Sequence, residues 1–209
     1  ELPAQQWDSW FALPSPLARK VTRWLDDSAL APGMIKKYMA ISQTVAKREG
    51  YFPPGVPVQV IHHPSDLPPA LSSASRYLFT VSRLDAPKRL DLLIRAMRAS
   101  SADVQLLIAG SGPQRSELEQ LIGDDERISL LGRVNDAQLR RYYGDALCVP
   151  FLPMDEDYGL ITVEAMQAGK PVLTCEDTGG VTELVETGRT GWIVPATEAA
   201  LASAIDDIA

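Results

Sequence analysis

Two glutamates and two cations stand where apolar runs give way to loops, and their types suit the binding of hydroxyls and phosphates. Glu156 and Glu164 end the stretch EDYGLITVE, which has a Tyr-Gly break and an apolar run between them. Arg83 and Lys88 lie five positions apart, between a strand-like run and a helical pattern. Such cations can converge on an anion, and the free N–H groups of a helix start add positive charge. The alternative is that both cations are ordinary solvated loop charges.

The two glutamates take different positions relative to a predicted helix. A helix that starts at Gly159 or Leu160 leaves Glu156 before its first turn and Glu164 about one and a quarter turns inside it. For Glu156, the simpler role is an acid that favours the helix dipole. Glu164 interrupts the apolar face of this helix, where a carboxylate is costly to bury unless it is hydrogen-bonded. A carboxylate so placed suits the vicinal hydroxyls of a ribose.

From Tyr77 onward, apolar runs alternate with helical patterns. The predicted strands are YLFTVS (77–82), VQLLIAG (104–110), ISLLG (128–132), LCVPF (147–151), PVLTC (171–175) and WIVP (192–195). The predicted helices are KRLDLLIRAMRAS (88–100), RSELEQLI (115–122), DAQLRRYYGDA (136–146), GLITVEAMQAG (159–169), VTELVETG (181–188) and EAALASAIDDIA (198–209). This order predicts an α/β fold with a doubly wound parallel sheet. Ligands of such sheets bind outside the carboxyl ends of the strands, so the loops that follow strands are the candidate sites.

Residues 1–68 follow another pattern. An aromatic-rich helical stretch, with Trp7, Trp10, Phe11, Val21, Trp24 and Leu25, precedes a strand KYMAIS (37–42), a helix QTVAKREGYF (43–52) and a strand PVQVIHH (57–63). Prolines and serines in 62–75 predict a linker. We therefore expect residues 1–68 to be the tail of an N-terminal domain and its linker, and 69–209 a C-terminal domain. His62 and His63 are not expected to share a role, because neighbours on a strand face opposite sides.

Composition excludes several classes of protein. The net charge of −7 disfavours nucleic acid or an anionic membrane as the main partner. Cys148 and Cys175 lie in apolar contexts and are expected to be reduced core thiols, so neither a disulfide scaffold nor a metal site is expected. No apolar run reaches the length of a membrane span, and the first residues do not form a signal peptide. The expected compartment is the cytoplasm.

The other strand-following loops give weaker signals. Gly110 begins GSGP, but the third glycine of a dinucleotide motif would fall at Arg115. A tight turn explains Gly110 better, although it stays a candidate binding residue. Arg133 and Val134 are open to contact with a planar base. Asn135 or Asp136 is an expected helix N-cap. Gly179 and Gly180 suit either the close approach of a ligand or a tight turn.

Taken together, these motifs resemble the donor-binding half of the retaining glycosyltransferases of family GT4, which have the GT-B fold. The resemblance covers about residues 76–209. It rests on Arg83 with Lys88, the E-x7-E from Glu156 to Glu164, GKPV (169–172), Gly-Gly with Glu183, which also suits an acid in a first helical turn, and TGRTGWIVP (187–195). Residues 40–66 are similar to the stretch that joins the family's two domains, with Ser42 and Asp66 at matching positions. Ser82 and Arg89 depart from the family pattern, which commonly has glycine at both positions.

The resemblance implies a role for each motif. Arg83 and Lys88 would neutralise the diphosphate of a sugar nucleotide and the charge that grows on the leaving group. Glu156 would bind the donor sugar and Glu164 the ribose. The backbone amides of Tyr158, Gly159 and Leu160 would hold sugar and phosphate, and the Arg133-Val134 loop would face the base.

The implied activity is transfer of a sugar from a UDP- or GDP-sugar to an acceptor glycan, lipid or small molecule, with retention of configuration. The donor is a substrate, so no cofactor or metal is expected. Peripheral membrane contact is expected only through the missing N-terminal domain, and residues 1–209 alone are expected to bind donor but transfer little. Two alternatives remain open: a non-catalytic nucleotide-sugar-binding module, and another GT-B enzyme such as an epimerase or a phosphorylase.

Overall fold

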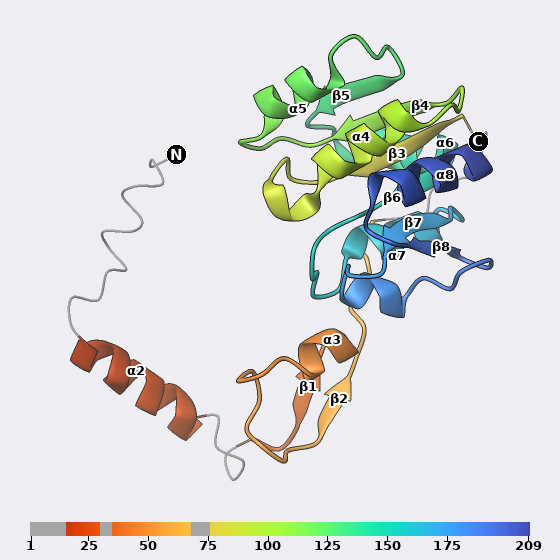
Figure 1. The fold of residues 1–209 in the computed structure, drawn as a ribbon. Helices are drawn as coiled ribbons and strands as arrows, with labels where there is room; N and C mark the ends of the chain where they lie inside the picture. The colour runs from red at the N-terminus through yellow and green to blue at the C-terminus, as the bar shows by residue number, and fades with distance from the viewer. Residues whose placement is uncertain (1–15, 30–34, 68–75) are drawn as a thin grey trace.

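The main body of the molecule is a six-stranded parallel sheet (Figure 1). The computed structural model describes residues 16–29, 35–67 and 76–209. The strands are β3 (Tyr77–Val81), β4 (Gln105–Ala109), β5 (Ile128–Gly132), β6 (Ala146–Pro150), β7 (Val172–Cys175) and β8 (Gly191–Val194). Their order is β5-β4-β3-β6-β7-β8, and every neighbouring pair is parallel. The predicted doubly wound α/β fold is confirmed.

Helices cover both faces of this sheet. They are α4 (Leu90–Ala99), α5 (Arg115–Ile122), α6 (Asp136–Asp145), α7 (Leu160–Gln167) and α8 (Glu198–Ile208). One core cluster joins α4, α5 and α8 to Leu78 and Cys148, and the other joins α6 and α7 to Phe79 and Val149. Successive strand residues thus enter opposite cores, which is why these strands are apolar at nearly every position. Cys148 and Cys175 are buried free thiols, as expected.

Two predicted helices of this part differ in the structure. The α-helix after β3 begins at Leu90 rather than Lys88, because the 3-10 turn η1 (Ala86–Lys88) and a left-handed Arg89 precede it. The helix predicted over 181–188 is wrong. Only the 3-10 turn η2 (Gly180–Glu183) forms there, and a turn follows that is closed by Thr190 N–H donating to the Glu186 carbonyl at 2.9 Å.

The earlier residues form a small separate sheet. Strands β1 (Tyr38–Ala40) and β2 (Val58–Val60) pair in parallel, with α3 (Gln43–Ala46) between them in sequence. The predicted helix over 43–52 is therefore only α3, and the predicted strand over 57–63 ends at Val60. Helix α2 (Pro16–Ala29) contains Val21, Trp24 and Leu25, as expected.

Some expectations fall on residues that the structure does not describe. Trp7, Trp10, Phe11 and the predicted boundary between residues 68 and 69 lie outside the described residues. Within the described ranges, no helix combines the length and the apolar character that a bilayer span requires.

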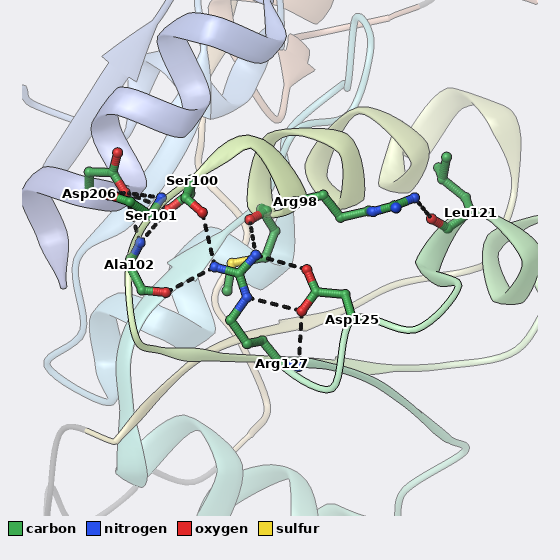
Figure 2. A network of polar contacts seen from close by, with 9 residues as sticks. Arg98, Ser100, Ser101, Ala102, Leu121, Asp125, Arg127 and Asp206 are labelled. Carbon is green, nitrogen blue, oxygen red and sulfur yellow. Dashed lines mark hydrogen bonds and ion pairs between the residues drawn. The ribbon is translucent and has the colours of Figure 1, made fainter.

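A polar network ties the ends of α4 and α8 to the sheet (Figure 2). The Asp206 carboxylate on α8 accepts hydrogen bonds from Ser100 Oγ at 2.6 Å and Ser101 N at 2.9 Å. Arg127, just before β5, donates to the carbonyls of Met97, Ser100 and Ala102 and pairs with Asp125. The last carbonyls of a helix have no partner inside it, so Arg127 satisfies the C-terminal end of α4.

We expect Arg127→Ala to lower the free energy of unfolding by about 2–3 kcal/mol, because it leaves several buried carbonyls unbonded. Bonding to Arg127 lowers the pKa of Asp125 below its ordinary 3.8. The stability that the Asp125–Arg127 pair contributes is therefore fully present above pH 3.8, and it is lost as the pH falls through the lowered pKa of Asp125. Urea unfolding at several pH values measures both effects. Arg98→Ala is the matched control, since Arg98 makes one exposed bond, to the Leu121 carbonyl. Equal losses in the two variants would contradict the role of Arg127.

Candidate functional site

The candidate site lies where the chain reverses its direction across the sheet. From β3 the chain proceeds to β4 and β5 on one side, and from β6 to β7 and β8 on the other. The loops after β3 and β6 therefore diverge and leave a crevice at the carboxyl ends of the strands. A cavity of about 320 Å³ lies there. Its lining includes Lys88 after β3, Phe151 and Glu156 after β6, the start of α7, and His63 from residues 40–66, which are called the linker segment below.

A larger cavity, of about 500 Å³, lies at the opposite edge of the sheet. It is lined by residues that precede β7 and β8, among them Lys170 and Arg189, and by Gly191 and Trp192 at the start of β8. Because ligands of doubly wound sheets bind at the carboxyl ends of the strands, the smaller cavity is the better candidate despite its size.

Lys88 and Glu156 form an ion pair within the smaller cavity. Their side chains are largely buried, with 19% and 26% of their surface exposed. The Lys88 ammonium also lies 5.7 Å from the centre of the Phe151 ring. Arg83 is different: its side chain is 79% exposed, pairs with Asp85 and does not line this cavity. The structure thus joins Lys88 to Glu156 and leaves the expected second cation at the surface.

The loop that carries Glu156 is held by a second loop, which follows β7. Glu156 N–H donates to the Thr178 carbonyl at 3.2 Å, and Gly180 N–H donates to the Glu156 carbonyl at 2.8 Å. A Cβ atom at Gly179 would lie 2.5 Å from the Glu156 carbonyl oxygen, and one at Gly180 would lie 2.3 Å from that of Asp157. The Gly-Gly pair is therefore required by the close approach of two backbones, which accounts for it without a ligand.

Residues 158–160 line the cavity at the start of α7. Gly159 has a φ of +81°, and a Cβ there would lie 2.7 Å from Val181 Cγ2. The first N–H groups of a helix have no partner within it, so this end of α7 presents donors toward the cavity. The Tyr158 hydroxyl donates to the His63 carbonyl at 3.0 Å, which anchors the loop to the linker segment.

Glu164 lies deeper in α7 and is hydrogen-bonded, as its expected position required. The hydroxyl of the fully buried Tyr143, on α6, donates to Glu164 Oε2 at 2.7 Å. Burial raises the pKa of Glu164, whereas the bond from Tyr143 lowers it. Tyr143 was not predicted from the sequence, because the helical pattern of 136–146 does not show that this hydroxyl faces α7.

His62 and His63 do not follow the alternation expected of a strand, because β2 ends at Val60. The His62 ring stacks on Tyr158, with centroids 5.5 Å apart and planes at 14°, while His63 lines the cavity. Both therefore lie at the candidate site. In the part of the chain that the structure describes, no group of three His, Cys, Asp or Glu side chains could hold a metal ion.

Gly110, Arg133 and Val134 lie at the carboxyl ends of β4 and β5, on the same edge of the sheet. Gly110 N–H donates to the Gly132 carbonyl at 2.7 Å, and a Cβ at Gly110 would lie 1.8 Å from the Ser82 carbonyl oxygen. Its N–H is thus not available to a ligand, and the tight-turn account fits it better. Arg133 Nε donates to Ser111 Oγ at 3.0 Å, and Val134 packs against the core of α6 and α7.

The linker segment is fastened to the same loops. Glu183 accepts hydrogen bonds from the N–H groups of Gln43 and Thr44, both at 2.7 Å, so it caps α3 rather than its own segment. These bonds outweigh the effect of burial and lower the pKa of Glu183. Ser42 Oγ donates to the Asp157 carbonyl, and Arg48 pairs with Asp157 at 2.7 Å. The sequence predicted neither the position of Glu183 nor the role of Arg48.

Comparison with known proteins identifies the family. The model of the glycosyl transferases group 1 family matches residues 75–209, which is more than half of the chain. The chain belongs to this family. The resemblance to family GT4 inferred from the motifs is thereby confirmed.

Two relatives show how similar this chain is to other glycosyltransferases. An uncharacterized glycosyltransferase of Methanocaldococcus jannaschii is 32% identical over 139 residues, which cover 64% of this chain and 35% of that protein. A phosphatidyl-myo-inositol mannosyltransferase of Mycobacterium leprae is 36% identical over 133 residues, covering 60% and 35%. The matched region thus spans about a third of the length of these relatives.

Solved structures share the fold. HepE of Anabaena, in complex with UDP and glucose, superposes with a TM-score of 0.71 at 23% identity, covering 92% of this chain and 59% of that one. Sucrose-phosphate synthase of Thermosynechococcus elongatus gives a TM-score of 0.73 at 24% identity, covering 94% and 54%. Both have the GT-B fold that the motifs implied.

We expect Tyr143→Phe to raise the pKa of Glu164 further, because it removes the hydrogen bond that favours the carboxylate. Titration by NMR with labelled glutamate side chains measures this shift. Tyr142→Phe is the matched control, since the neighbouring Tyr142 stacks on Phe79 instead. A Glu164 pKa that is equal in all three proteins would show that the Tyr143 bond does not control this carboxylate.

Proposed function

We propose that this chain binds the donor, a UDP- or GDP-sugar, for a glycosyltransferase that retains the anomeric configuration. One observation carries the proposal: the crevice between β3 and β6 joins a lysine, a glutamate and a helix start in one cavity. A diphosphate needs cations and N–H donors, and a sugar needs a carboxylate that accepts from its hydroxyls. The cavity offers a cation, a carboxylate and the N–H groups at the start of a helix, all from the loops after β3 and β6.

Lys88 would neutralise the diphosphate and the negative charge that grows on it as the sugar leaves. In the structure, Lys88 is paired with Glu156. A bound diphosphate would compete for Lys88 and release Glu156 toward the hydroxyls of the sugar. The pair would thus neutralise two largely buried charges until a bound donor takes the place of one partner. This role would offset the free-energy cost of desolvating the two charges.

Glu164 would bind the ribose hydroxyls. Tyr143 engages Oε2 of this carboxylate at 2.7 Å and so fixes its orientation. The amides at Tyr158, Gly159 and Leu160 would hold the sugar and the phosphates at the start of α7. Arg133 and Val134 would lie beside the base. Arg83 would have to leave Asp85 to reach a phosphate.

The rest of the reaction is inferred for the longer protein of which this chain is taken to be a part. Its acceptor would be a glycan, a lipid or a small molecule, and it would need neither a cofactor nor a metal. The relatives support sugar transfer as the activity: one is named as a mannosyltransferase, and HepE was solved with UDP and glucose. We further propose that the protein works in the cytoplasm, with membrane contact made only by its acceptor-binding part.

Calorimetric titration of the chain with UDP and with GDP tests the donor site. We expect one of them to bind with a dissociation constant below a millimolar, Lys88→Ala to weaken it at least tenfold, and Glu164→Gln to weaken it several-fold. Each interaction lost would then be worth about 1 kcal/mol or more. Lys37→Ala and Glu119→Gln change exposed residues outside the cavity and serve as matched controls. No binding of either nucleotide at millimolar concentration would refute the assigned site.

Retention is tested on the full-length protein with its donor. We expect the transferred sugar to keep the anomeric configuration that it has in the donor, as measured by the coupling constant of the anomeric proton in the first product formed. An inverted product would contradict the retaining mechanism while leaving the donor site intact.

A further inference from the structure

Two strained residues flank the Lys88–Glu156 pair. Among the described residues, the non-glycine positions with positive φ are Arg89, at 50°, and Asp155, at 48°. Arg89 directly follows Lys88, and Asp155 directly precedes Glu156. This conformation favours glycine, and a short polar residue such as aspartate tolerates it better than arginine does. Strain of this kind persists where the surroundings enforce it, so the contacts of Arg89 are of interest.

The Arg89 side chain makes four hydrogen bonds. Nε donates to the Leu152 carbonyl at 2.6 Å, and Nη2 donates to the Pro153 carbonyl at 3.0 Å. The two terminal nitrogens also bind the Asp177 carboxylate, at 2.7 and 2.8 Å. Only 14% of the Arg89 side chain is exposed. Its bond to Asp177 lowers the pKa of that carboxyl group.

These contacts join three loops at the crevice. Arg89 belongs to the loop after β3, Leu152 and Pro153 begin the loop after β6 that carries Glu156, and Asp177 belongs to the loop after β7. The same loops are linked by backbone: Met154 N–H donates to the Pro87 carbonyl at 2.8 Å, and Asp155 N–H donates to the Asp177 carbonyl at 3.1 Å. Arg89 is thus a side-chain bridge across an existing backbone connection.

We propose that Arg89 is a positioning residue, whose guanidinium holds the Glu156 loop at the place where Lys88 and the donor sugar reach it. The inference deepens the proposed function and rests on it for the meaning of the site. The alternative is that Arg89 itself binds phosphate. Four of its five N–H groups are already engaged and its charge is matched by Asp177, so little remains for a ligand. The strain in the Arg89 backbone would then be a free-energy cost that the ordering of the Glu156 loop requires.

Hydrogen exchange of the free chain tests the positioning role without any ligand. We expect Arg89→Gly to raise the exchange rate of peptides over residues 152–158 at least tenfold, and Arg89→Lys and Asp177→Asn to raise it less. Peptides over β4 should exchange at the wild-type rate, since glycine suits the left-handed backbone and relieves its strain. Arg98→Ala is the matched control, because Arg98 lies at the other end of the helix that follows Arg89 and donates to one carbonyl, that of Leu121 on α5.

Unchanged exchange over 152–158 in Arg89→Gly would overturn the proposal, as would a uniform rise throughout the sheet, which would indicate general destabilisation. Should Arg89→Gly not fold, Arg89→Lys decides: it removes the guanidinium that bonds Leu152, Pro153 and Asp177 together, and wild-type exchange over 152–158 in that variant would equally overturn the proposal.

Binding of UDP and UDP-glucose provides a second measurement that loss of stability alone would not change. We expect Arg89→Gly to weaken UDP-glucose at least fivefold more than UDP, because Glu156 would bind the sugar alone, whereas Lys88 and the start of α7 would still hold the diphosphate. Equal loss for the two ligands would overturn the positioning of the sugar site. If the wild-type chain binds GDP rather than UDP, the same comparison is made with GDP and a GDP-sugar. If it binds neither nucleotide at millimolar concentration, the proposed function fails, while the exchange result still decides the role of Arg89.

Discussion

The ion pair between Lys88 and Glu156 spans the point where the two halves of the sheet diverge, and the surrounding structure serves to hold it. Two largely buried charges are costly to desolvate, and their attraction repays that cost only if their geometry is well fixed. The geometry comes from the backbone. The Glu156 loop rests on the loop after β7, where Gly179 and Gly180 allow an approach that no side chain would permit. Stability alone gives little reason for such an ion pair, and the proposed binding of a donor would supply one.

The linker segment gives this crevice a second wall. His63 lines the cavity. The Tyr158 hydroxyl donates to the His63 carbonyl, the Tyr158 ring stacks on His62, and Glu183 caps α3. The Glu156 loop is therefore held from three directions: by the loop after β7, by Arg89 and by the linker segment. Any displacement of the β1–β2–α3 unit relative to the sheet would act directly on the loop that is proposed to hold the donor sugar.

The sequence predicted the parts of the fold that depend on local periodicity. The six strands of the main sheet and most of its helices follow from apolar runs that are interrupted by helical patterns, and the loops at the strand ends contained the cavity. The predictions from the sequence were wrong where the structure depends on the residue at which a helix or strand ends. The strand expected over 57–63 ends at Val60, so the alternation that separated His62 from His63 does not apply. The segment 181–188 has a helical pattern, yet only the 3-10 turn Gly180–Glu183 forms there, directly after the glycines that pack against the Glu156 loop.

Tertiary contacts decided the remaining residues of the site. Nothing in the local sequence distinguishes Lys88, whose ammonium lies in the cavity, from Arg83, which bonds to the nearby Asp85 and stays in solvent. Tyr143 and Glu183 act on residues of other elements, so neither spacing nor periodicity shows their partners. Arg89 was visible as a departure from the family pattern, but only its bonds to Leu152, Pro153 and Asp177 give that departure a physical reason.

The central claim is that a donor's diphosphate replaces Glu156 as the partner of Lys88. A crystal structure of the chain with UDP tests it most directly. The account predicts the diphosphate against Lys88 and the first amides of α7, the ribose hydroxyls on Glu164, and Glu156 no longer bonded to Lys88. UDP bound elsewhere, or bound in the crevice with the Lys88–Glu156 pair intact, would contradict it.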